Sequence, residues 1–155
     1  MATRLMPSAP SSNPSTYAEL FRASPVARIE MIKSGFPARE AKSMLARLSL
    51  QSGEAMRALR LSTATVNRKT AANETLPPED SERVFGLAKL IGQVQVMVEE
   101  AGDSTGFDAE KWISAWLGEP VPALGGRRPI ELLDTMEGQA LVAQTLARIQ
   151  SGAYA

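Results

Sequence analysis

The 155-residue sequence predicts an all-α fold, and three observations support that prediction. From residue 24 onward, apolar residues recur at the three- and four-residue spacing of amphipathic helices. The first two predicted helices contain no alternation of apolar and polar residues that would indicate a strand. Capping residues and glycines bound the apolar runs, as Ser24 and Gly35 do around the first helix.

Composition excludes most kinds of catalysis. The chain has no cysteine and no histidine, so thiolate and imidazole metal sites are missing, as are Ser-His and Cys-His nucleophile pairs. It also has no G-x-S-x-G, Ser-x-x-Lys, Walker-type or G-x-G-x-x-G motif. We therefore expect a protein that is not an enzyme, with no catalytic residues, no metal and no cofactor.

The sequence offers no sign of a membrane or secreted protein. No apolar run reaches the roughly 18 residues of a membrane-spanning helix. The first twenty residues contain no apolar signal core. We expect a cytoplasmic protein without a membrane partner.

Opposite charges gather in the two halves of the chain. Residues 1–73 carry eleven Lys and Arg against four Asp and Glu, whereas residues 74–155 carry six against thirteen. The balances of +7 and −7 cancel to the net charge of zero. Such asymmetry indicates one surface for a polyanion and another for a different partner. Accidental clustering of solubilising charge is the alternative.

The N-terminal part is predicted as a tail followed by two helices. Residues 1–22, rich in Ser, Pro and Ala, are expected to be a flexible tail. The first helix begins at Ser24-Pro25 and ends at Gly35. Its apolar residues Val26, Ile29 and Ile32 share one face. The second helix starts at Pro37, with an apolar stripe formed by Ala41, Met44, Leu45 and Leu48.

Residues 51–73 have the pattern of a helix-turn-helix. A short helix, Gln51 to Leu59, is followed by a turn and by a polar helix from Thr63 to Ala72, capped by Ser62. Arg60 occupies the turn where a glycine is common. The polar helix directs Val66 to the core and exposes small, polar and basic side chains suited to base edges and phosphates. The candidate DNA-binding residues are Thr63, Ala64, Thr65, Asn67, Arg68 and Lys69. Similar helix pairs also occur in proteins that do not bind DNA.

A long helix is predicted from about Glu79 to Glu100. The acidic residues of its first turn complement the helix dipole, which we favour over a Mg²⁺ site. Apolar residues cover much of its circumference, so neighbours must pack on several of its sides. Either a central strut or a homodimer face satisfies that requirement.

The C-terminal part contains an aromatic helix, a loop rich in proline and glycine, and a last helix. Asp108 caps the first of these helices, on which Trp112 and Trp116 share a face. Both core packing and anchoring of a partner protein are open for these side chains. The last helix runs from about Met136 to Gln150.

Several short sequences in this part point to a known family. They are Trp116-Leu117, Pro120, Pro122-Ala123-Leu124-Gly125-Gly126, Pro129-Ile130-Glu131-Leu132-Leu133-Asp134-Thr135, Glu137-Gly138, Arg148-Ile149, Gly152 and Tyr154. This series resembles the toxin-binding domain of Xre/MbcA/ParS antitoxins. Leu61 to Leu76 and Ser81-Glu82-Arg83 are similar to the Xre-like helix-turn-helix of that family. The resemblance covers about residues 25–155.

The resemblance implies a DNA-binding and dimerisation domain over residues 23–100 and a small helical toxin-binding domain over residues 101–155. It further implies a type II toxin–antitoxin module, whose toxin is a RES-domain protein that consumes NAD⁺. The antitoxin is then expected to be a homodimer that covers the toxin's active site and represses its own operon by binding operator DNA.

The same resemblance implies toxin contacts at the glycine loop and at the chain's end. These are Leu124, Gly125, Gly126, Arg127, Arg128, Pro129, Gly152, Ala153, Tyr154 and Ala155. Two other readings remain open. One is a stand-alone helix-turn-helix regulator with a C-terminal oligomerisation or ligand domain. The other is a hydrolase using carboxylates such as Asp134 and Glu137.

Overall fold

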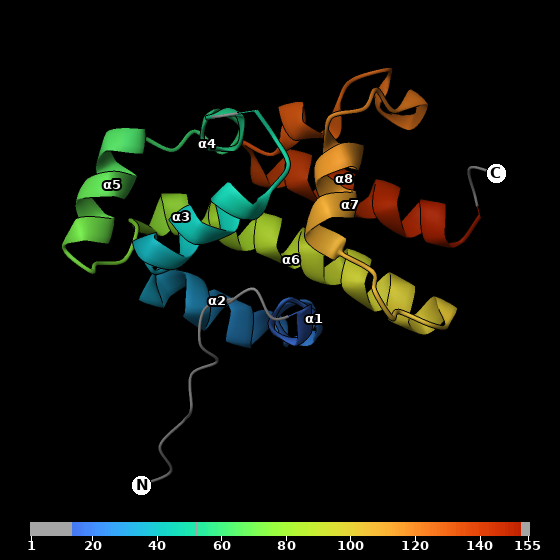
Figure 1. The fold of residues 1–155 in the computed structure, drawn as a ribbon, viewed down its shortest axis with the longest axis horizontal. Helices are drawn as coiled ribbons and strands as arrows, with labels where there is room; N and C mark the ends of the chain where they lie inside the picture. Colours follow the sequence, from blue (N-terminus) through green and yellow to red (C-terminus); the bar gives the residue numbers. More distant parts are fainter. Residues whose placement is uncertain (1–13, 52, 153–155) are drawn as a thin grey trace, which may run out of the picture.

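Helix α6 (Pro78–Ala101) runs through the centre of the molecule, and helices from both halves of the chain pack against it (Figure 1). A computed structural model describes residues 14–51 and 53–152. The remaining elements, in chain order, are α1 (Pro14–Arg22), α2 (Pro25–Ser34), α3 (Ala38–Arg47), α4 (Glu54–Ala58), α5 (Thr63–Ala71), α7 (Ala109–Leu117), the short 3₁₀ helices η1 (Pro122–Leu124) and η2 (Pro129–Leu132), and α8 (Met136–Gln150). The predicted all-α fold is confirmed.

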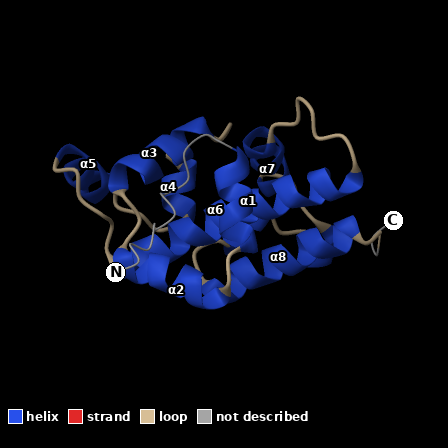
Figure 2. Ribbon diagram, turned by 90° about the horizontal axis from the view of Figure 1, so that it is seen from below, coloured by secondary structure: helices blue, strands red, loops and turns tan. Residues whose placement is uncertain are grey.

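The breadth of the apolar surface on α6 explains its central position. Helices α1, α2, α7 and α8 all contact it, so it is enclosed by its own chain and acts as a strut (Figure 2). Even two glutamines are buried on it, and Gln93 Nε2 donates to the backbone oxygen of Ala143 on α8, 2.9 Å away. One continuous cluster of buried apolar side chains joins elements from both halves of the chain. The two halves therefore share a core.

The first correction concerns the N-terminus. Residues 14–22, expected to belong to a flexible tail, form helix α1, whose Tyr17 and Leu20 are buried against α6. The close approach depends on Gly92 of α6, because a β-carbon there would overlap the backbone oxygen of Tyr17. The segment was predicted to be a tail because it is rich in serine, proline and alanine, although its few large side chains have helical spacing. Residues 1–13 of the expected tail lie outside the described residues.

Helix α2 has the predicted bounds but a different orientation. Ser24 Oγ accepts a hydrogen bond from Ala27 N at 3.1 Å, and Gly35 ends the helix. The expected apolar face is largely turned to solvent, with Val26 65% and Ile29 49% exposed. The helix packs instead through Met31, and Arg28 binds the backbone oxygen atoms that end α1.

Candidate functional site

The predicted helix-turn-helix is formed by α4, α5 and the turn between them. Ser62 caps α5, accepting from Thr65 N at 3.2 Å, and Val66 is fully buried, as predicted. Arg60 has a φ of +52°, the left-handed conformation that a glycine adopts more readily. Arg83 of α6 holds the turn from the other side, donating from Nε to the backbone oxygen of Leu59 at 2.6 Å.

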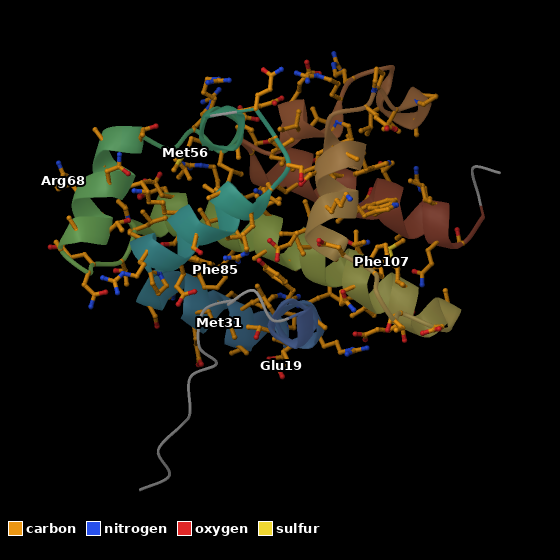
Figure 3. All side chains as sticks on the ribbon, viewed as in Figure 1. Glu19, Met31, Met56, Arg68, Phe85 and Phe107 are labelled. Atoms are coloured by element: carbon orange, nitrogen blue, oxygen red, sulfur yellow. The ribbon has the colours of Figure 1, made fainter. Side chains whose placement is uncertain are left out.

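The candidate DNA-binding residues lie along one helix at an end of the molecule. Thr63, Ala64, Asn67 and Arg68 are exposed, whereas Thr65 and Lys69 are half-buried. Figure 3 shows Arg68 at the outer edge of the molecule. The ammonium group of Lys69 lies 3.4 Å from Glu74, just beyond the helix. Helix α5 therefore presents a polar, basic surface that nothing else in the described chain covers.

The glycine loop between α7 and α8 is folded back on itself. Val121 N donates to Arg127 O and Gly126 N donates to Val121 O, each at 3.1 Å. Gly125 and Gly126 have φ of +68° and +80°, and open space surrounds the positions of their missing β-carbons. Of the expected toxin contacts, Leu124 and Pro129 are buried beneath the loop, whereas both glycines and Arg127 are exposed.

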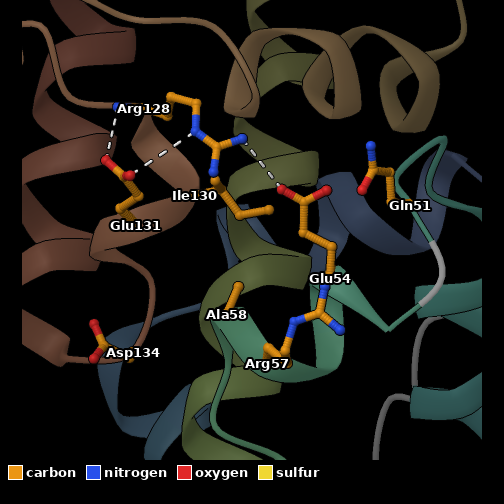
Figure 4. Close-up of a pocket in the computed structure, with 8 residues that line it drawn as sticks. All are labelled: Gln51, Glu54, Arg57, Ala58, Arg128, Ile130, Glu131 and Asp134. Carbon is orange, nitrogen blue, oxygen red and sulfur yellow. Dashed lines mark hydrogen bonds and ion pairs between the residues drawn. The ribbon is translucent and has the colours of Figure 1, made fainter.

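The two adjacent arginines of this loop have different environments. Arg127 makes no side-chain hydrogen bond or ion pair with the described residues. The guanidinium of Arg128 lies 3.3 Å from Glu54 of α4, and its backbone N–H donates to the Glu131 carboxylate at 3.1 Å (Figure 4). These groups border a cleft of about 510 Å³ between α4 and η2. The loop is thus fastened to the first helix of the helix-turn-helix.

Of the other candidate residues, Gly152 lies at the far end of the molecule from α5. Gly152 is exposed with a φ of +75°, and Ala153, Tyr154 and Ala155 lie outside the described residues. Figures 1 and 2 both place α5 and the end of α8 at opposite ends of the molecule. The structure therefore brings the glycine loop next to α4 but keeps the end of α8 and Gly152 apart from the DNA-binding candidates.

Three charged or polar groups link the halves at a point that the sequence did not indicate. Arg47 of α3 donates to Glu110 of α7 and to the hydroxyl of Tyr17 on α1, both at 3.0 Å. Burial raises the pKa of Tyr17 above its ordinary value, and the Arg47 hydrogen bond opposes that rise. In the sequence, Tyr17 lies 30 residues and Glu110 lies 63 residues from Arg47, so no local pattern predicts these contacts.

The two carboxylates of the alternative hydrolase hypothesis, Asp134 and Glu137, have different environments. Asp134 Oδ2 lies 3.1 Å from Nε of Arg60, while Glu137 is exposed on α8. Among residues 14–51 and 53–152, no cluster of three or more acidic side chains is arranged to hold a metal ion. None of the helices described in this part of the chain is long and apolar enough to cross a bilayer.

Comparison with known proteins finds two matching domain families and two related antitoxins. Residues 27–89 match the antitoxin Xre-like helix-turn-helix domain, and residues 104–152 match the antitoxin Xre/MbcA/ParS C-terminal toxin-binding domain. The chain is 57% identical to the Prs ADP-ribosylating antitoxin of Sphingobium sp. (strain YBL2) over 92% of its length and 89% of that protein. It is 27% identical to the antitoxin Xre of Yersinia enterocolitica over 81% of its length and 80% of that protein.

These matches cover both units described above. Antitoxins and helix-turn-helix domains act by binding, which confirms the expectation that the protein is not an enzyme. The first matched domain runs from α2 into α6 and contains the α4–α5 pair, and the second contains α7, η1, η2 and α8. The chain therefore belongs to the Xre/MbcA/ParS family of antitoxins.

Proposed function

We propose that the protein neutralises a RES-domain toxin that consumes NAD⁺, by covering the toxin's active site. The observation that carries the proposal is the 57% identity to an antitoxin whose name refers to ADP-ribosylation, a reaction that takes its ADP-ribose from NAD⁺. The match of residues 104–152 to a toxin-binding domain supports the assignment of residues 101–155 as the toxin-binding unit.

The glycine loop has the features of an inhibitory contact. Gly125 and Gly126 expose their backbone without side chains in the way, so a partner surface can approach closely. Arg127 offers an unpaired guanidinium to acidic or phosphate-binding groups of the toxin. Arg128 has a different role, because Glu54 and Glu131 already hold it and fix the loop's shape. The antitoxin thus acts by occlusion and supplies no chemistry.

Binding to the toxin in a catalytically inactive form tests this proposal. Arg127→Ala should weaken the complex at least about tenfold, because it removes a charged contact from the interface. Arg39→Ala, which removes an exposed arginine on α3, is the matched control and should bind like the wild type. Deleting residues 152–155 should also weaken neutralisation without loss of helicity. Unchanged affinity in both the Arg127 variant and the deletion would contradict the proposed contact surface.

We also propose that the protein is a homodimer that represses its own operon through α5. Residues 23–100 form the DNA-binding and dimerisation unit in this proposal, and the dimer sets two α5 helices about one DNA turn apart. Arg68→Ala should cost about 1–3 kcal/mol of base discrimination. The readout is competition between operator and scrambled DNA, and equal discrimination by wild type and variant would contradict the role of Arg68. Such a protein works in the cytoplasm, where operator DNA is accessible.

The alternative is a stand-alone regulator whose C-terminal unit oligomerises or binds a ligand. It predicts operator binding without a stable complex with the toxin candidate encoded beside it. Co-purification of the two proteins separates the readings.

A further inference from the structure

The chain's two tryptophans stack on each other on the outer side of α7. The ring centroids of Trp112 and Trp116 are 6.1 Å apart and the ring planes differ by 13°. Trp116 is half-buried and packs against the core, whereas Trp112 is 37% exposed. Ile113 and Leu117 are fully buried and anchor α7 without help from Trp112. Packing on Trp116 covers part of Trp112, but more than a third of this large aromatic side chain remains in solvent.

The surface around Trp112 is open and has a charged border. Ala115 lies three residues after Trp112 on α7 and is exposed. The charged residues Asp108, Lys111 and Glu119, at or near the ends of this helix, are exposed as well. The small side chain of Ala115 adds little bulk on this face of the helix. The indole N–H of Trp112 makes no hydrogen bond with the described residues. An apolar centre with a polar border is the usual anatomy of a protein interface.

We infer that Trp112 is an aromatic anchor residue through which the antitoxin binds its toxin, an inference that rests on the proposed function. Trp112 lies within residues 104–152, the region matched to a toxin-binding domain. The other large exposed apolar residues described there are aliphatic: Met136, Leu141 and Ile149. Tryptophan is the side chain most enriched among residues that dominate binding energy. Trp116 supports the anchor from behind, because stacking limits the orientations that the Trp112 ring adopts.

The chemistry of the anchor specifies the complementary surface on the toxin. The ring requires an apolar depression, and the unpaired indole N–H requires a carbonyl or carboxylate oxygen at its edge. DNA is disfavoured as the occupant, because α5 lies at one end of the molecule and α7 lies apart from it, over the middle part of α6 (Figure 1).

Fluorine NMR and binding measurements on the full-length protein test the inference. Incorporation of 5-fluorotryptophan gives two resonances, which Trp112→Phe assigns. The inactive toxin should shift the Trp112 resonance and abolish its solvent-isotope shift, with a smaller change at Trp116. Trp112→Ala should raise the dissociation constant about tenfold or more. Ile29→Ala is the matched control, since Ile29 is an exposed apolar residue outside residues 104–152. Circular dichroism and thermal unfolding verify that each variant is folded.

The outcomes separate this inference from the proposed function. If the wild type does not bind the toxin, both fail. If the wild type binds but Trp112 stays solvent-accessible in the complex, or Trp112→Ala binds within about twofold of the wild type, only the inference is overturned. It is also overturned if operator DNA or a rise in antitoxin concentration alone protects Trp112 while the toxin does not.

Discussion

Arg60, in the turn of the helix-turn-helix, places Nε 3.1 Å from Oδ2 of Asp134, which follows η2 in the C-terminal unit. The Arg60 side chain is 72% exposed, so solvent screens the ion pair and limits its value to about 1 kcal/mol or less. The backbone at this residue carries an opposing cost, because its φ of +52° is unfavourable for any residue with a β-carbon. The free energy gained from the ion pair and the free energy lost to the left-handed backbone are therefore of similar size.

Comparison of Arg60→Gly with Arg60→Ala isolates the backbone term. Both variants lose the ion pair, but only alanine keeps a β-carbon in the left-handed conformation. We expect Arg60→Ala to be less stable than Arg60→Gly by about 1 kcal/mol, measured by urea unfolding. Equal stability would mean that the turn relaxes to another conformation in solution.

A second prediction concerns the contact between α1 and α6. Gly92→Ala places a β-carbon against the backbone of Tyr17, which cannot rotate away, so α1 must move. We expect a loss of about 1–3 kcal/mol in the free energy of unfolding. Gly118→Ala is the control, because its β-carbon meets ordinary van der Waals distances of 3.7 Å and more. If both variants melt at the wild-type temperature, α1 is not packed on Gly92.

The buried hydroxyl of Tyr17 predicts a dependence of stability on alkaline pH. Burial raises its pKa above the ordinary 10.0, so above that pH the unfolded chain releases the proton before the folded one does. The stability contribution is therefore complete below pH 10 and decreases as the pH rises through the folded-state pKa. Tyr17→Phe removes this contribution, so its free energy of unfolding should fall less steeply above pH 10. Parallel pH profiles for the two proteins would be inconsistent with a raised pKa.

A fourth prediction follows from the pairing of Lys69 with Glu74. Glu74→Gln frees the ammonium group for a phosphate and removes a negative charge beside α5. We expect a few-fold tighter binding of operator DNA at low salt, with the salt slope steeper by about 1. Glu119→Gln, which removes an exposed carboxylate from the other unit, should leave DNA binding unchanged. Weaker binding by Glu74→Gln would indicate that the pair positions α5 instead of competing with DNA.

Local signals in the sequence located most helix ends. Ser24, Ser62 and Asp108, the predicted caps, each accept a hydrogen bond from the backbone N–H three residues ahead, and a cap of this kind depends only on neighbouring residues. The same locality explains why α5 and the exposure of Thr63, Ala64, Asn67 and Arg68 could be predicted, whereas Thr65 and Lys69, predicted to be exposed, are half-buried.

Contacts between distant segments account for what the sequence did not indicate. Helix α1 depends on the missing side chain of Gly92, more than 70 residues away. The outward orientation of Val26 and Ile29 follows from which side of α2 meets α6. The glycine loop has no repeating pattern that would show Leu124 as buried and its neighbours as exposed. Nor does the sequence show that Glu54 binds Arg128 while Arg127 stays unpaired.

The length of α6 has a steric consequence. Its 24 residues extend about 36 Å, close to the 34 Å repeat of the double helix. A duplex bound at α5 and a toxin bound near Gly152 would thus stand roughly one helical repeat apart. A toxin that also contacts the glycine loop would reach α4, next to the helix-turn-helix, so its binding there would affect the binding of DNA.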